Sequence, residues 1–364
     1  MLARVARRAL ILGGTGAIGF AICQRLLSSG WRVDLTGRDP AHVPPQLTAA
    51  AGATFTTLDR DDSTALAALV GAGADLLVDC VCFTARQAEA LVPMLSSVTS
   101  SVVISSKAVY MDDLGRHSNS AAPACFAAPI TETQATLHPN HAPFNSREGY
   151  GPNKVAAEQV LLNSPHPVSI LRPSKVHGAW SRQPREWVFV KRVLDRRPVV
   201  VLANRGLGAD HPSAAANIAA LIDIVAARPG QRVLNIADPD APNVLAISRV
   251  IAGHLGYTWQ EHLVDASAGD GSLGVTPWSR LPPVVLATSA AEMLGYRPVG
   301  TYAETVTREL DWLMSAATHD SLAAWAVPNI AGRSWAALFD YAAEDHALAL
   351  RSTVFSTNSP ASLG

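Results

Sequence analysis

The 364-residue sequence lacks an excess of either charge, because 29 Lys and Arg residues are balanced by 30 Asp and Glu residues. A protein that binds nucleic acid through a basic surface needs such an excess to displace counterions from phosphates, so we expect no nucleic-acid partner. Charged residues make up only 16% of the chain, whereas 48% of it is hydrophobic. This balance excludes intrinsic disorder, which requires low hydrophobicity and high net charge.

Long apolar segments are missing too. No uncharged hydrophobic run reaches the ~18 residues that a membrane-spanning helix needs, so we expect no membrane partner. Arg4, Arg7 and Arg8 precede the apolar residues 9–12, but glycines interrupt that run before a secretory signal could form. We therefore expect a soluble protein of the cytoplasm.

Cysteine and lysine are scarce, with four residues of each. Four cysteines without a Cys-x-x-Cys pair make no disulfide framework. His138 and His141 lie three positions apart around a proline, and no third ligand is evident, so we expect no metal site. Because there are only four lysines, the position of each one carries information.

Short apolar runs alternate with helical patterns through the first 175 residues, which is typical of a parallel sheet with helices on both faces. We expect an α/β fold in which residues 1–175 form one doubly wound domain. The expected strands are 9–12, 32–36, 53–58, 75–80, 101–105 and 168–171. The Pro-, His- and Ser-rich segment 111–147 is too long for an ordinary connection, which favours a functional lid or a mobile segment.

The pattern changes after residue 175, and we expect a smaller, partly interleaved substrate-binding region over 176–316. Within it, residues 217–238 carry a helix and a strand that could return to the first sheet. Further helices are expected at 186–194, from Ser289, at 301–314 and at 335–350. Residues 317–364 form a C-terminal extension of unknown role, which either packs over the second region or takes part in a homodimer.

A glycine-rich loop, Gly13-Gly14-Thr15-Gly16-Ala17-Ile18-Gly19, joins the first expected strand to the first expected helix. In such a loop one glycine permits the tight turn, a second lets the backbone approach a pyrophosphate, and a third allows the helix to pack closely on the strand. The helix N-terminus then favours the phosphate charge. The loop therefore predicts a dinucleotide site.

The end of the second strand indicates which dinucleotide binds. An acid there would bind the ribose hydroxyls of NAD, whereas an arginine favours the 2′-phosphate of NADP. Arg38 follows the strand directly, while Asp34 lies inside it, two residues too early. We predict NADP(H) over NAD(H), and residues 1–175 are therefore expected to form a Rossmann-like, NADP-binding domain.

Tyr150 and Lys154 are four residues apart, which places them on one face of the helix expected to begin near Tyr150. A phenol is a poor acid or base at neutral pH, because its ordinary pKa is about 10. A neighbouring ammonium stabilises the phenolate and makes proton transfer easier. The pair therefore predicts acid–base chemistry on an oxygen.

These motifs together resemble the extended branch of the short-chain dehydrogenases/reductases, also described as the NAD-dependent epimerase/dehydratase family. The resemblance rests on the glycines at 13, 16 and 19, on Tyr150-Gly151-Pro152-Asn153-Lys154, and on Ser105-Ser106-Lys107-Ala108-Val109-Tyr110. It extends through 171–178 and 294–298, and covers about residues 9–315.

The resemblance implies roles for individual residues. Ser106 is the hydroxyl that polarises the substrate oxygen, with Ser105 as the neighbour most easily confused with it. Tyr150 exchanges the proton, and Lys154 also holds the nicotinamide ribose. Asp59 either contacts the adenine or caps the following helix. The residues expected to bind the cofactor are Gly13, Thr15, Gly16, Ile18, Gly19, Arg38, Asp59 and Lys154.

Departures from the family pattern narrow the reaction. Sugar-nucleotide dehydratases carry Asp-Glu directly after the polarising hydroxyl, whereas this chain has Lys107-Ala108, so we do not expect dehydration. We expect an NAD(P)(H)-dependent enzyme that transfers hydride at a ketone or secondary alcohol of a small or glycosylated metabolite. A nucleotide-sugar epimerase and a non-catalytic NADP- or RNA-binding relative remain the alternatives.

The sequence gives less information about which residues contact the substrate than about the cofactor site. Lys107 either contacts an anionic group of the substrate or is a solvated surface lysine, and we expect Trp187 beside the substrate. The arginine that sugar-nucleotide enzymes aim at the diphosphate is missing. Its replacement could be Arg182, Arg185 or Arg205.

Overall fold

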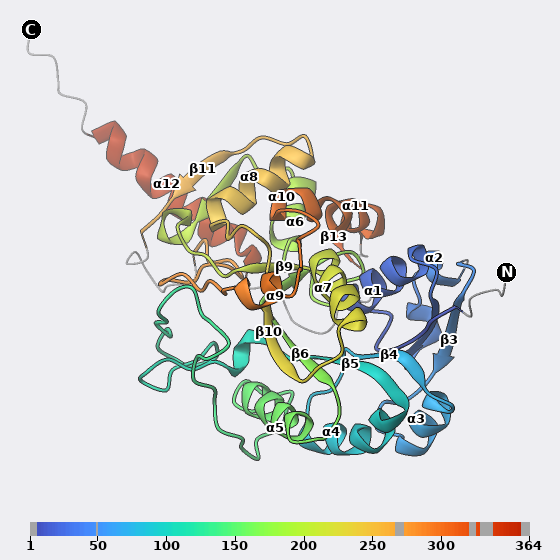
Figure 1. Cartoon of the computed structure of the whole chain (residues 1–364). Coiled ribbons are helices and arrows are strands. Elements are labelled where there is room, and N and C mark those ends of the chain that lie inside the picture. The colour runs from blue at the N-terminus through green and yellow to red at the C-terminus, as the bar shows by residue number, and fades with distance from the viewer. Residues whose placement is uncertain (1–5, 49, 266–272, 320–324, 328–337, 358–364) are drawn as a thin grey trace, which may run out of the picture.

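A seven-stranded parallel sheet forms the centre of the molecule (Figure 1), in the order β10-β6-β5-β4-β1-β2-β3. The computed structural model describes residues 6–48, 50–265, 273–319, 325–327 and 338–357. The strands of the sheet are β1 Arg8–Leu12, β2 Arg32–Gly37, β3 Ala53–Thr57, β4 Ala74–Asp79, β5 Val98–Ile104, β6 Val168–Pro173 and β10 Arg232–Ile236.

The sheet is covered on both faces. Helices α1 (Ala17–Ser28) and α7 (Ala215–Ala227) pack on one face, and α3 (Ser63–Val70), α4 (Ala85–Leu91) and α5 (Tyr150–Leu162) on the other (Figure 1). Alternate residues of β1 serve the two cores, since Ala9 and Ile11 face α1 while Leu10 and Leu12 face α4 and α5. Strands buried on both faces are expected to form continuous apolar runs. The fold is therefore the doubly wound, Rossmann-like α/β fold expected from the sequence.

The second half of the chain returns to this sheet before it forms its own core. Strand β10 pairs in parallel with β6, so α7 and β10 extend the edge of the first sheet. A separate core gathers around Phe189, Trp259 and Trp278. Its elements are α6 Trp187–Leu194, β8 Val199–Leu202, α8 Val244–His254, β11 Gln260–Leu263, α10 Tyr302–Thr305 and α11 Thr307–Ala316. The helix expected over 301–314 is thus divided into two, with Val306 between them.

Short elements connect these parts. Strands β7 (Lys175–His177) and β9 (Pro212–Ala214) pair in parallel and lead from the sheet into the second core. The other α-helices and strands are α2 Pro45–Thr48, α9 Ser289–Met293, β12 Thr318–His319, β13 Trp325–Ala326 and α12 Tyr341–Thr357. No helix in the described part of the chain is long and apolar enough to cross a membrane.

The segment 111–147 is mostly irregular but anchored. Isolated bridges join Tyr110 to Thr136 and Met111 to His117. The Asp112 carboxylate accepts backbone hydrogen bonds from Leu114, Arg116 and Cys125, which lowers the pKa of Asp112 to about 2. The segment is therefore an ordered covering over the sheet edge.

The C-terminal helix α12 packs against α6. Arg192 on α6 forms an ion pair of 2.5 Å with Glu344, and both side chains are 4% exposed. The Tyr341 hydroxyl donates to Asp195. Of the helix expected over 335–350, residues 335–337 lie outside the described residues, and α12 begins at Tyr341. The extension thus packs over the second core.

Substitution of two neighbouring acids on α12 tests how much the contact between α12 and α6 contributes to stability. Glu344→Ala leaves the buried Arg192 guanidinium without its carboxylate, so we expect a loss of about 2–4 kcal/mol of unfolding free energy. Asp345→Ala removes an ion pair with Arg197 in which the Asp345 side chain is 58% exposed, so the loss should stay within about 1 kcal/mol. Urea unfolding measures both, and equal losses would contradict the packing of α12 described above.

Candidate active site

The glycine loop has the geometry of a phosphate cradle. Gly13 adopts a φ of +80°, which permits the turn after β1. A Cβ on Gly19 would lie 2.5 Å from the carbonyl oxygen of Gly13, so the absence of a side chain allows α1 to pack closely on the loop. A Cβ on Gly16, at the start of α1, would meet nothing within 4 Å. The open space at Gly16 faces the first amide groups of α1, which fits a bound pyrophosphate.

Two serines end β5, and the structure separates their roles. The Ser105 hydroxyl donates to Glu158, which also forms a buried ion pair of 2.5 Å with Arg172. The Ser106 hydroxyl accepts a hydrogen bond of 3.1 Å from Ala108 and lines the cavity. Because Ser105 is committed to Glu158, Ser106 is the hydroxyl with a proton to offer a ligand.

Tyr150 and Lys154 lie on the first turns of α5. The ammonium of Lys154 donates to the carbonyl oxygens of Cys82 at 2.7 Å and Ile104 at 2.8 Å, and it lies over the ring of Phe83. An ammonium has three N–H donors, so one remains for a ligand. Lys154 is 3% exposed, and these contacts fix its position. Ser106, Tyr150 and Lys154 line one cavity of ≈ 810 Å³, together with Ile18.

The same cavity is strongly basic. Its lining includes six cationic side chains and one carboxylate, which belong to Lys107, Arg147, Lys154, Lys175, Arg185, Arg280 and Asp210. Asp210 pairs with both Lys107 and Lys175. Burial and the nearby charges of Lys175, Arg280 and Arg185 nevertheless lower the pKa of Lys107 well below its ordinary value. An anionic ligand would relieve this repulsion.

The segment 111–147 forms part of the cavity wall. Its contribution comes from Ser118, Asn119, Phe144, Asn145, Ser146 and Arg147. Arg147 Nε donates to the carbonyl oxygen of Asn119 at 2.7 Å, and the ring of Phe144 stacks on that of Phe83. The placement supports the interpretation of this segment as a lid.

The structure corrects two expectations about substrate contacts. Trp187 is 5% exposed and packs in the second core, so it does not line the cavity; the face of α6 that carries it is buried against β8 and α8. Lys107 is 8% exposed and paired with Asp210, so the interpretation as a solvated lysine is wrong. Of the three arginines considered as substitutes, Arg185 lines this cavity, whereas Arg182 lines a second one.

Several charged residues of the cavity were not identified from the sequence, among them Lys175, Arg280, Arg147 and Asp210. Lys175 could have been, because it is one of only four lysines and lies in the family-like segment 171–178. Arg280 has no local signal, since it comes from a loop far along the chain and reaches the cavity only through the fold.

The residues around β2 bear on the cofactor. Arg38 follows β2 and is exposed, while Asp34 forms an ion pair of 2.7 Å with Arg8 and is thus engaged elsewhere. Asp62, not Asp59, caps α3, since Ala65 donates to the Asp62 carboxylate at 2.9 Å. The Asp59 carboxylate accepts a hydrogen bond of 3.0 Å from the Asp61 amide and is exposed. The capping role considered for Asp59 is therefore wrong.

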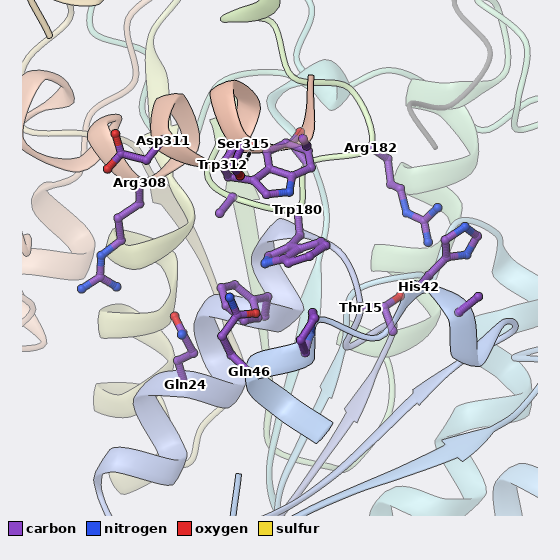
Figure 2. Close-up of a pocket in the computed structure, with 16 residues that line it drawn as sticks. Thr15, Gln24, His42, Gln46, Trp180, Arg182, Arg308, Asp311, Trp312 and Ser315 are labelled. Atoms are coloured by element: carbon purple, nitrogen blue, oxygen red, sulfur yellow. Dashed lines mark hydrogen bonds between the residues drawn. The ribbon is translucent and has the colours of Figure 1, made fainter. Parts of the chain in front are cut away.

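A second cavity of ≈ 810 Å³ begins at Thr15 of the glycine loop. It lies between α1, the segment after β2, and α11. Figure 2 shows Arg182 and His42 pointing toward one another beside Thr15, with Trp180 and Trp312 further along the wall. The two tryptophan rings are 5.7 Å apart.

This chain resembles a known protein family in sequence and several solved structures in fold. A model of the NAD dependent epimerase/dehydratase family matches residues 9–206. A dTDP-glucose 4,6-dehydratase from Bacillus anthracis, solved with NAD, is similar at 14% identity and a TM-score of 0.65 over 85% of this chain and 97% of that one. A UDP-glucose 4-epimerase from Thermotoga maritima, solved with UDP-glucose, is similar at 15% identity and a TM-score of 0.62 over 85% and 99%.

A third similar structure is a UDP-N-acetylglucosamine 4-epimerase from Methanobrevibacter ruminantium, with 14% identity, a TM-score of 0.65 and coverage of 85% and 99%. No curated protein matches the sequence significantly. At these identities the structural likeness concerns the fold.

Substitutions at two glycines of the loop distinguish an effect on folding from an effect on cofactor binding. Gly19→Ala forces a Cβ onto the Gly13 carbonyl, so we expect a loss of about 1–3 kcal/mol of unfolding free energy. Gly16→Ala meets no protein atom and should cost about 1 kcal/mol or less as a helix cap. It should nevertheless weaken NADPH binding about tenfold or more, because the Cβ fills the space left for phosphate. Unfolding and fluorescence titration measure the two effects, and a Gly16→Ala protein that binds NADPH normally would exclude this cradle.

Proposed function

Because the chain belongs to the NAD-dependent epimerase/dehydratase family, we propose that this enzyme transfers hydride between NADP(H) and a ketone or secondary alcohol of an anionic small molecule. The observation that carries the proposal is the single cavity in which Ser106, Tyr150 and Lys154 meet a strongly basic wall. The glycine loop at its edge supplies the cradle for the cofactor.

The three residues divide the proton chemistry among them. When bound, the nicotinamide of the cofactor supplies or accepts the hydride. The Ser106 hydroxyl donates a hydrogen bond to the substrate oxygen and so polarises it. The Tyr150 phenol gives its proton to that oxygen during reduction and removes it during oxidation. The fixed ammonium of Lys154 stabilises the phenolate and offers its third N–H to the nicotinamide ribose.

The basic wall defines the class of substrate. Lys107 follows Ser106 directly, and its side chain lies in the cavity beside Asp210. A carboxylate or phosphate bound there would lie within a few bonds of the carbon that reacts. Arg185 and Arg280 offer further donors for the same anion or for a second one. We therefore assign a substrate with at least one anionic group close to its carbonyl.

A nucleotide-sugar epimerase is the second candidate. Two similar structures are UDP-sugar 4-epimerases, and Arg147, Arg185 and Arg280 together could bind a diphosphate. Dehydration remains the least favoured reaction, because Lys107 stands where the sugar-nucleotide dehydratases carry an acid.

The preference for NADP(H) rests on charge near the adenosine ribose. Arg38 is exposed at the end of β2, and Asp34 is held by Arg8, so no acid of this strand is available for the ribose hydroxyls. Arg182 and His42 add donors in the second cavity, beside Thr15 (Figure 2). This arrangement favours a 2′-phosphate over a free hydroxyl.

Tyr150→Phe tests the catalytic assignment. Loss of the phenol proton should lower turnover by about 10²- to 10⁴-fold, while NADPH binding by fluorescence titration stays unchanged. Turnover is followed at the nicotinamide absorbance band with a panel of phosphorylated and carboxylated ketones and of UDP-sugars. Ser105→Ala is the matched control for Ser106→Ala, and only the latter should impair a well-folded enzyme. Wild-type turnover in Tyr150→Phe would refute the mechanism.

The same assay separates the two candidate reactions. A reductase consumes one NADPH for each molecule of substrate, whereas an epimerase converts its substrate with a catalytic amount of cofactor and no net change in absorbance. Conversion of UDP-sugars without net absorbance change would replace the reductase by the epimerase.

Arg38→Ala tests the cofactor preference. Removing a charge-assisted contact with the 2′-phosphate should weaken NADPH binding about 10- to 100-fold and leave NADH binding within about twofold. Arg32→Ala, at the opposite end of β2, is the control and should change neither affinity. An unchanged preference for NADPH in Arg38→Ala would remove Arg38 from the site.

A further inference from the structure

A cluster of buried acids around one histidine lies behind the wall of the active-site cavity. His177 ends β7, Glu186 precedes α6 and Glu309 lies on α11; their exposed fractions are 2%, 1% and 0%. A ring nitrogen of His177 and one carboxylate oxygen of each glutamate all lie within 4.8 Å of one another. Their chain neighbours Val176 and Arg185 line the cavity, so the cluster lies next to the substrate site without being part of it.

His177 offers a free nitrogen to this cluster. Its Nε2 lies 2.7 Å from the Asp238 carboxylate, which also accepts from Ala214 and from the Asn217 side chain. Because an ionised carboxylate only accepts hydrogen bonds, Nε2 carries a proton, and Nδ1 carries a lone pair whenever the ring holds that proton alone. Nδ1 is buried and has no hydrogen-bond partner. A carboxylate that orients the far nitrogen in this way is typical of histidines that ligate metal ions.

Each glutamate contributes one further unsatisfied atom. The Tyr302 hydroxyl donates to Glu186 Oε1 at 3.3 Å, and the Gly178 amide donates to Glu309 Oε2. The other oxygens, Glu186 Oε2 and Glu309 Oε1, are buried and accept no hydrogen bond. Buried carboxylates that face each other need positive charge between them. A proton shared by the two glutamates would leave His177 Nδ1 unsatisfied, and a proton on Nδ1 would be donated to one carboxylate oxygen and leave the other without a partner. A divalent cation would satisfy all three atoms.

We propose that His177, Glu186 and Glu309 bind a divalent transition-metal ion, with Zn²⁺ as the first candidate and Mn²⁺ as the second. One imidazole and two carboxylates form a donor set that suits both ions, and the cluster contains no thiol. Because the ligands are fully buried, the ion is structural: it fastens α6 and α11 of the second core to β7. The site goes beyond the proposed reaction and uses none of its catalytic residues.

Metal content provides the test. The intact protein is loaded with Zn²⁺ or with Mn²⁺, freed of unbound ion on a desalting column, and analysed by elemental mass spectrometry. We expect about one equivalent per chain in the wild type, as for a closed structural site. Glu309→Gln and Glu186→Gln should each lose at least about nine-tenths of it, since an amide is a poor ligand for these ions. Chelator treatment should lower the melting temperature of the wild type but not that of Glu309→Gln or Glu186→Gln.

The variants are chosen so that folding and metal binding can be separated. The amide in Glu309→Gln can donate a hydrogen bond to Glu186, so this variant should fold, as checked by circular dichroism. Glu89→Gln, an exposed residue of α4, is the control and should bind metal like the wild type. Absence of either metal from the loaded wild type would show that a shared proton holds the cluster, and equal metal in the wild type and both glutamine variants would place the ion elsewhere. Neither outcome depends on the enzymatic activity.

Discussion

The ammonium of Lys154 is the contact on which the active site depends. It fastens α5 to the carbonyl oxygens of Cys82 and Ile104, which follow β4 and end β5, and so closes the sheet edge where the cavity opens. A cation buried to this degree is stable only because carbonyl dipoles and the Phe83 ring surround it. With Lys154 fixed, the position of Tyr150 one turn earlier is fixed as well. Ser106 is positioned from the same edge, since it follows β5 directly.

Opposite charges are concentrated on the two sides of one wall. The cavity side carries Lys107, Lys175, Arg185 and Arg280 with Asp210 as the one acid among its lining residues, whereas the far side carries Glu186, Glu309 and Asp238 around His177. The acids of the far side are buried, so solvent does little to screen their charge. An anionic substrate on one side and a metal ion on the other would each neutralise the excess. Arg185 and Glu186 are adjacent in sequence, and Arg185 lies on the cavity side while Glu186 lies on the far side.

The fold was largely predictable because its signals are local. The apolar run of β1 and the glycine that follows it are dictated by burial on both faces of the sheet and by the turn at Gly13. The proposed catalytic residues were identified for the same reason, since Tyr150 and Lys154 lie on one helix and Ser106 at one strand end. The expectation for Trp187 failed because an aromatic side chain near a family motif can equally serve a core. That choice depended on β8 and α8, whose packing no spacing in the sequence reveals.

The sequence by itself determined the doubly wound sheet, the glycine loop and the placement of Tyr150 and Lys154 on one helix, because each depends on residues only a few positions apart. The tertiary structure decided what surrounds them. Arg280 joins Lys107 in the cavity, Ser105 is taken by Glu158, and Glu309 reaches His177, each across many tens of residues. The physical reason is that charge and burial act through space: whether a lysine is solvated or paired, and whether a carboxylate is free or a ligand, depends on neighbours that only the complete fold supplies.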